Sequence, residues 1–145
     1  MQSEYFIREY QERDYESIAA LWEDTGLGGA HRGDDKDIIR ATIDLGGKLL
    51  LLIDVKNNSI IGSSWLTTDG RRSYMHHFGI ATQHQGKGLA NMLLDASLEE
   101  AKKIGRQIKL EVHIDNLKAL KLYKKAGFAY LGDYAVYIIR DIDNL

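Results

Sequence analysis

The sequence predicts an α/β layered domain built on a mixed sheet, and two observations carry this prediction. First, the apolar runs 48–55, 59–68 and 72–81 are separated by the turn residues Asn57-Asn58 and Asp69-Gly70. Such turns between strand-like runs indicate hairpins, so three antiparallel strands are expected in succession. Second, the apolar spacing then becomes helical and another strand follows, an alternation typical of layered α/β proteins.

Before these strands, the chain predicts one strand and two helices. Residues 5–10 read as an opening strand, and Asp14 can cap a helix whose apolar side chains follow at helical spacing. Residues 25–33 contain four glycines and no apolar period, so they predict a loop. A second helix is expected to start at Asp34 or Asp35 and to end at a pair of glycines.

The C-terminal half predicts two further helices and three further strands. A helix from residue 86 to about 104 is followed by a strand at 108–114 and by a short helix at 117–126. Phe128–Leu131 and Tyr134–Asp141 are expected to form a final strand pair. The resulting order, β-α-α-β-β-β-α-β-α-β-β, indicates helices layered on a mixed sheet.

Composition limits the classes of partner. A length of 145 residues with 44% hydrophobic content fits a single domain over residues 1–145. A net charge of −2 and a pI near 6.2 provide no basic field for nucleic acid or anionic lipid, so neither partner is expected. The absence of cysteine excludes disulfides and thiolate sites, and no metal is expected. Because no leader or run of about 20 apolar residues is present, we expect a soluble cytoplasmic protein.

Residues 83–90, Gln-His-Gln-Gly-Lys-Gly-Leu-Ala, lie where a strand ends and a helix begins. The first turn of a helix offers unpaired N–H groups and a positive dipole end, which attract phosphate. Gly86 and Gly88 allow a phosphate to approach the backbone, and Lys87 adds a cation. A P-loop is excluded because Gly88 stands where Ser or Thr is required, and a dinucleotide fingerprint is excluded because residue 91 is Asn. For the loop alone, a glycine-rich junction without a ligand remains the alternative.

The remaining pattern, Gln-x-x-Gly-x-Gly/Ala, resembles the GCN5-related N-acetyltransferases, the GNAT family, in their small stand-alone bacterial form. A second motif from Asn116 to Phe128 resembles, without a gap, the family signature Asn-x-x-Ala-x-x-x-Tyr-x-x-x-Gly-Phe. The resemblance implies the GNAT fold, a mixed and mostly antiparallel sheet of six to seven strands flanked by four helices.

The resemblance also implies an activity. The chain is expected to be an acetyl-CoA-dependent N-acetyltransferase that moves an acetyl group to a primary amine of a small molecule, amino acid, peptide or protein. Transfer would proceed by direct attack in a ternary complex. A catalytically weak module of the same fold that senses acyl-CoA is the alternative.

By the same resemblance, three parts of the chain contact acetyl-CoA. Backbone groups of the strand at residues 78–80 would meet the pantetheine arm, which lies there like an added strand. The amides of 85–90 would hold the pyrophosphate, and Asn116 would cap the last helix and bond the pantetheine or a nearby carbonyl, although a plain cap needs no ligand. The expected cofactor-binding residues are Phe78, Gly79, Ile80, Gln85, Gly86, Lys87, Gly88, Leu89, Ala90 and Asn116.

Two departures from the family pattern fall in this loop. The family usually has Pro where Thr82 stands and often Arg where Gln85 stands. Losing the arginine removes one positive charge, which Lys87 partly replaces. Neither departure removes the backbone amides, which supply most of the expected binding.

Tyr123 and His76 are the expected catalytic residues. Tyr123 matches the family tyrosine that faces the thioester sulfur, and a phenol with a pKa near 10 can donate a proton to a forming thiolate. His76 stands where many relatives have glutamate, and a neutral imidazole is a competent base near pH 7. A core tyrosine, and a sheet histidine with the proton leaving through water, are the respective alternatives.

Strand alternation predicts the orientation of this histidine. Tyr74, His76, Phe78 and Ile80 should share one face of the strand, whereas His77 and its alternating neighbours should share the other. His84 is expected to be a solvent-exposed loop residue.

The acceptor is an amine that the sequence does not name. The family resemblance places its walls in the loop between the first two helices and in the hairpin near residue 70, where side chains of both charges occur. The final strand pair is a candidate contact for a homodimer.

Overall fold

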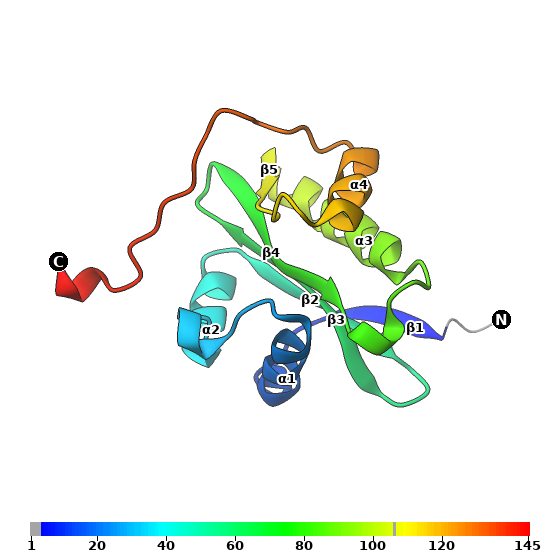
Figure 1. The fold of residues 1–145 in the computed structure, drawn as a ribbon. Helices are drawn as coiled ribbons and strands as arrows, with labels where there is room; N and C mark the ends of the chain where they lie inside the picture. Colours follow the sequence, from blue (N-terminus) through cyan, green and yellow to red (C-terminus); the bar gives the residue numbers. More distant parts are fainter. Residues whose placement is uncertain (1–3, 106) are drawn as a thin grey trace. The chain divides into compact units, whose positions relative to one another are not determined.

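A computed structural model describes residues 4–105 and 107–145 of the chain (Figure 1). The chain divides into two compact units, Met1–Glu111 and Val112–Leu145. The first unit contains the sheet and three helices, and the second contains the fourth helix. The expectation of one domain over residues 1–145 stays a prediction.

The first unit follows the predicted order of elements. Its helices and strands are β1 (Tyr5–Glu9), α1 (Tyr15–Thr25), α2 (Lys36–Asp44), β2 (Lys48–Asp54), β3 (Ser59–Thr68), β4 (Arg72–Ile80), α3 (Leu89–Ile104) and β5 (Gln107–Leu110). Short 3₁₀ turns lie between them: η1 (Glu12–Asp14), η2 (Ala30–Arg32) and η3 (Thr82–His84). The second unit contains α4 (Leu117–Ala126) and η4 (Ile142–Asn144).

The five strands form one mixed sheet in the order β1-β2-β3-β4-β5. The first three pairs are antiparallel, as the hairpin turns predict, and β4 and β5 are parallel because α3 connects them. The β4–β5 register covers only Arg72–Met75 of β4, although β4 continues to Ile80. The two strands therefore stop pairing halfway along β4.

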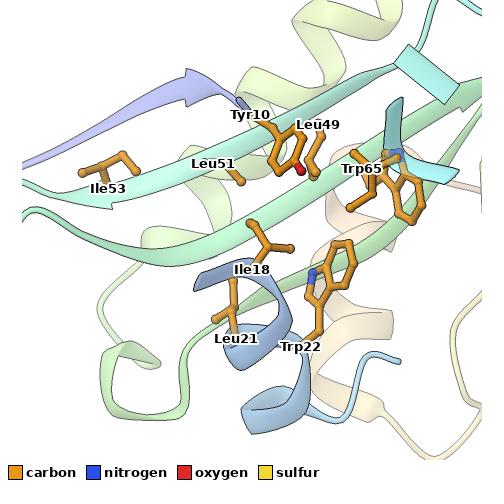
Figure 2. Close-up of a cluster of buried hydrophobic side chains, with 9 residues drawn as sticks. Tyr10, Ile18, Leu21, Trp22, Leu49, Leu51, Ile53 and Trp65 are labelled. Atoms are coloured by element: carbon orange, nitrogen blue, oxygen red, sulfur yellow. The ribbon is translucent and has the colours of Figure 1, made fainter. Parts of the chain in front are cut away.

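Both faces of the sheet are covered. Side chains from α1, α2, β2 and β3 form one core, which includes the fully buried Ile18 and Leu51 and the Trp22–Trp65 pair (Figure 2). The second core lies toward α3 and contains Leu50, Leu52 and Leu93. In Figure 1, α1 and α2 lie on one side of the strands and α3 on the other. Burial on both faces explains why β2 is a nearly continuous apolar run.

The predicted helix caps are confirmed in part. Asp35 caps α2 by accepting a hydrogen bond from the Ile38 N–H at 2.9 Å. Asp14 occupies the N-cap position of α1 but makes no side-chain cap bond. Its carboxylate instead forms a bidentate pair with Arg8 on β1, at 2.8 and 2.9 Å, which holds the pKa of Asp14 below its usual value.

The fold class is confirmed, but the predicted final strand pair is wrong. Phe128–Leu131 and Tyr134–Asp141 contain no strand, and the sheet has five strands instead of six to seven. Between the two segments, Gly132 has a φ of +73° and the chain bends at Asp133. Strand-favouring side chains stay exposed, including Tyr137 at 91%, because β-propensity produces a strand only where a ladder and a packed face are available.

The strand expected at 108–114 is also shorter. It ends at Leu110, opposite Met75, where the register with β4 ends. No helix in the described part of the chain is long and apolar enough to cross a membrane.

Neighbouring isoleucines on α2 test the core assignment. Ile39 is fully buried, whereas Ile38 is 44% exposed. We predict that Ile39→Ala lowers the free energy of unfolding by about 2–5 kcal/mol, because it leaves a cavity in the core beneath α2. The matched change Ile38→Ala should cost less than about 1 kcal/mol. Urea unfolding of both variants measures the difference, and equal losses would contradict the assigned core face.

Candidate functional site

The predicted site begins where β4 leaves β5. Residues His76–Ile80 lie beyond the register that joins the two strands, and they lead through η3 to the start of α3. This part of β4 still pairs with β3, with Gly79 opposite Ser63 and Ile80 opposite Gly62. This part of the strand is therefore held by β3 on one side, and on the other side it extends past the end of the β5 register.

A β-bulge at His77 changes the predicted faces of β4. His76 is opposite Trp65 and Gly79 is opposite Ser63, so β4 has one residue more than β3 between these pairs. His77 takes a left-handed backbone conformation, φ +46°, which histidine tolerates better than most residues. Its carbonyl accepts a 2.6 Å hydrogen bond from Ser63 Oγ, which in turn accepts one from Trp22 Nε1 at 3.0 Å.

The bulge brings two histidines to one face, so strict alternation is wrong here. His76 lies beside Trp65, and His77 packs on both Trp22 and Trp65, all on the side of α1 and α2. Phe78 and Ile80 pack with the α3-side core, on the face opposite to His76. The bulge could not be predicted from the sequence. One extra residue changes which face of the sheet the following side chains point to, and the order of apolar residues does not mark where this happens.

His76 is held by a hydroxyl and an aromatic ring. Its Nε2 lies 2.8 Å from Thr67 Oγ1, and its ring stacks on Tyr74 with centroids 5.5 Å apart. Burial, and secondarily the neighbouring His77, lower the pKa of His76 below the usual value. The ring is thus neutral at neutral pH, and a neutral ring can accept a proton.

His77 is enclosed by tryptophans and faces a carboxylate. Its ring centroid lies 4.3 Å from that of Trp22, and its Nε2 lies 3.1 Å from Asp34 Oδ2 in the loop after η2. Burial lowers the pKa of His77, whereas Asp34 acts against this shift. Asp34 was expected only as an acceptor-loop or helix-start residue, and its contact with β4 depends on how that loop folds.

The start of α3 has the features of an anion site. Gly86 and Gly88 have φ of +82° and +78°, conformations that glycine adopts at no steric cost, and Gly88 is the N-cap. No side-chain cap bond satisfies the first turn of α3, whereas Asp35 caps α2 and Asn116 caps α4. Leu89 is buried and anchors this turn.

Side chains around η3 hold this loop against the first unit. Gln85 Nε2 donates to the Ile80 carbonyl at 2.9 Å, and Thr82 donates to Asp24 of α1 from both its N–H and its hydroxyl at 3.1 Å. His84, predicted to be solvent-exposed, is half-buried with its Nε2 3.3 Å from Asp54 Oδ2 at the end of β2. Lys87 is exposed. The supporting roles of Asp24 and Asp54 were missed, since only the tertiary fold brings them to η3.

The second unit contains the two remaining predicted site residues. Asn116 Oδ1 caps α4 by accepting from the Ala119 N–H at 3.2 Å. Tyr123 is buried on α4, its ring 5.7 Å from Phe128, and burial raises the pKa of its phenol to about 12. The structure thus brings together the predicted residues from His76 to Ala90, while the contribution of Asn116 and Tyr123 to the site stays a prediction.

Comparison with known proteins identifies the family. The model of the acetyltransferase (GNAT) family matches residues 4–128. The chain belongs to the GNAT acetyltransferase family. A curated acetyltransferase from Yersinia pestis (strain Pestoides F) is 30% identical over 125 residues, which cover 84% of this chain and 86% of the relative.

Solved structures of GNAT proteins share the fold. An acetyltransferase from Streptococcus agalactiae has a TM-score of 0.75 at 16% identity, with 97% of this chain and 94% of that chain covered. A putative acetyltransferase from Salmonella typhimurium, solved with its cofactor acetyl-CoA, has a TM-score of 0.71 at 21% identity, with coverage of 88% and 80%. Membership of the family assigns this chain to acetyl transfer from acetyl-CoA.

The residues present fit acetyl-CoA. A pyrophosphate suits the uncapped start of α3, and an extended pantetheine arm suits the part of β4 beyond the β5 register. No group of three or more His, Cys, Asp or Glu in residues 4–105 and 107–145 is arranged to hold a metal ion.

Replacing Gly86 tests the anion site. We predict that Gly86→Glu abolishes the rise in melting temperature that acetyl-CoA causes, because a carboxylate is placed among the amides meant for phosphate. Gly70→Glu is the matched control, since Gly70 is exposed in the β3–β4 turn with φ +84°. Differential scanning fluorimetry with and without acetyl-CoA measures the shift. A shift that survives in Gly86→Glu would show that the pyrophosphate binds elsewhere.

Proposed function

We propose that this GNAT acetyltransferase is an N-acetyltransferase that transfers the acetyl group of acetyl-CoA to a primary amine by direct attack in a ternary complex. One observation carries the proposal: the part of β4 beyond the β5 register connects two imidazoles of lowered pKa to the uncapped start of α3. A cofactor lying along this part of β4 would present its thioester beside groups that can accept a proton. An amine nucleophile requires such a group, because it must lose protons to become an amide.

The cofactor would be held mainly by backbone. The amides of Gln85 through Ala90 bind the pyrophosphate at the positive end of α3, and Lys87 adds a mobile charge beside it. Backbone groups of Phe78, Gly79 and Ile80 meet the pantetheine arm beyond the end of the β5 register. Bound acetyl-CoA supplies an activated acetyl thioester. Because these contacts use the main chain, they do not require the Arg and Pro that relatives often carry in this loop.

His76 acts as the general base in this proposal. Its Nε2 is engaged by Thr67 Oγ1, which fixes the ring and leaves Nδ1 to face a ligand. Its lowered pKa keeps the imidazole in the proton-accepting form at neutral pH.

Tyr123 acts as the general acid. A phenol with a pKa of about 12 is fully protonated at neutral pH, so it holds the proton that the departing thiolate needs. Asn116 fixes the first turn of the same helix, and its remaining amide donors can bond the pantetheine or a carbonyl.

Removing the phenol tests the acid role. We predict that Tyr123→Phe lowers kcat by about tenfold or more while the affinity for acetyl-CoA changes little, since only proton donation is lost. Steady-state thiol release and calorimetric titration with acetyl-CoA measure the two quantities. An unchanged kcat would exclude Tyr123 as the acid.

An acceptor screen tests the reaction class. The purified chain is incubated with acetyl-CoA and matched primary amines, alcohols and thiols, and both released thiol and acetylated product are measured. Acetylation of amines alone is the expected result. Transfer to oxygen would contradict the N-acetyltransferase proposal, and tight acetyl-CoA binding without any turnover would identify an acyl-CoA-sensing module instead.

A further inference from the structure

The contact between His77 and Asp34 lies outside the role assigned to His76. The bulge places His77 on the same face of β4, and its side chain is only 11% exposed. Its Nε2 is buried and lies 3.1 Å from Asp34 Oδ2, without an aligned hydrogen bond to any described residue. With Nε2 facing Asp34, Nδ1 is the second ring nitrogen of the imidazole.

The surroundings hold this pair in place from two sides. Trp22 and Trp65 pack on the imidazole, and Ser63 fixes its backbone carbonyl. On the other side, Gly28 in the loop between α1 and α2 lies close to the His77 imidazole. A Cβ atom added to Gly28 would be 3.0 Å from His77 Nε2. The loop between α1 and α2 is therefore seated directly on the imidazole.

Acetylation of an alkylammonium removes two protons from its nitrogen, one before attack and one during it. An amine of the lysine type has a pKa near 10.4, so at pH 7 the ammonium form exceeds the neutral form by about 10³-fold. R–NH₃⁺ first loses a proton and keeps the electron pair on nitrogen. The nitrogen then bonds the acetyl carbon, the C–S bond breaks with its electron pair on sulfur, and a second N–H proton leaves. The thiolate takes up one proton and solvent receives the other.

We propose that the Asp34–His77 pair binds the acceptor as an alkylammonium and removes its first proton, at Nδ1 of His77. The inference rests on the proposed function, in which His76 takes the proton released during attack. Asp34 supplies the negative charge that attracts an ammonium ion and stabilises the imidazolium that forms. The substrate class is accordingly an amine that is cationic at neutral pH.

The charges facing His77 are consistent with this role. Asp34 opposes the effect of burial on the His77 pKa, Arg32 of η2 lowers that pKa, and the neighbouring His76 lies on the same strand. Glu111, after β5, acts on His76. Because burial dominates, His77 is neutral and ready to accept a proton at neutral pH.

Two acceptor amines of similar shape can distinguish loss of the first proton, before attack, from loss of the second proton, during attack. The first is an alkylamine found in the acceptor screen, and the second is its fluorinated analogue, whose amine is already neutral at pH 7. Asparagine suits the left-handed backbone at position 77, so His77→Asn removes titration with little strain. We expect His77→Asn and Asp34→Asn to reduce kcat/KM for the alkylamine about tenfold more than for the fluorinated analogue.

His76→Asn is the matched control, and it should reduce kcat/KM for both acceptors alike. Equal losses for both acceptors in His77→Asn, or no loss for either, would overturn the proposal. If wild-type protein acetylates neither amine, the proposed N-acetyltransferase function fails, which is a distinct result.

A second measurement does not depend on turnover. NMR titration of the imidazole resonances gives the pKa of His77 in wild-type protein and in Asp34→Asn. Loss of the carboxylate removes a group that raises this pKa, so the pKa should fall in the variant, while melting temperatures show that both proteins are folded. An unchanged His77 pKa would show that the two side chains are not paired, and would overturn the inference even if both amines are acetylated.

Discussion

The site depends on one constraint: β4 pairs with β3 from Ser73 to Ile80, apart from the bulge at His77, but with β5 only over Arg72–Met75. Pairing with β3 on both sides of the bulge at His77 keeps β4 within the sheet. On the other side the register with β5 ends at Met75, and α3 begins soon after the end of β4 at Ile80. An anion at the helix start and an extended group along the strand can therefore belong to one ligand.

The bulge at His77 adds chemistry to this geometry. A regular strand would place His76 and His77 on opposite faces, whereas the extra residue turns both toward α1 and α2. The buried tryptophans that build this core also desolvate the two imidazoles, and this lowers the pKa of both. Packing and proton chemistry thus have the same cause, since the side chains that stabilise the fold also keep the histidines neutral.

Most of the first unit could be predicted from sequence because its signals are local. The Asn57-Asn58 and Asp69-Gly70 turns predict the hairpins, and Gly86 and Gly88 mark the start of α3. The bulge, the Asp34 contact and the half-buried state of His84 could not be predicted, since each depends on residues distant in sequence. The strand predicted over 134–141 failed for a related reason: its β-branched residues indicate propensity, and propensity alone does not supply a partner strand.

Acetyl-CoA titration of ¹⁵N-labelled protein, followed through the backbone amides, tests the central claim most directly. If the cofactor lies along β4 and ends at α3, the largest chemical-shift changes will fall on the amides of Phe78–Ile80 and Gln85–Ala90. The Gly70 amide in the β3–β4 turn provides an internal reference and should change little. Changes concentrated away from β4 and the α3 start, or no saturable change, would contradict the account.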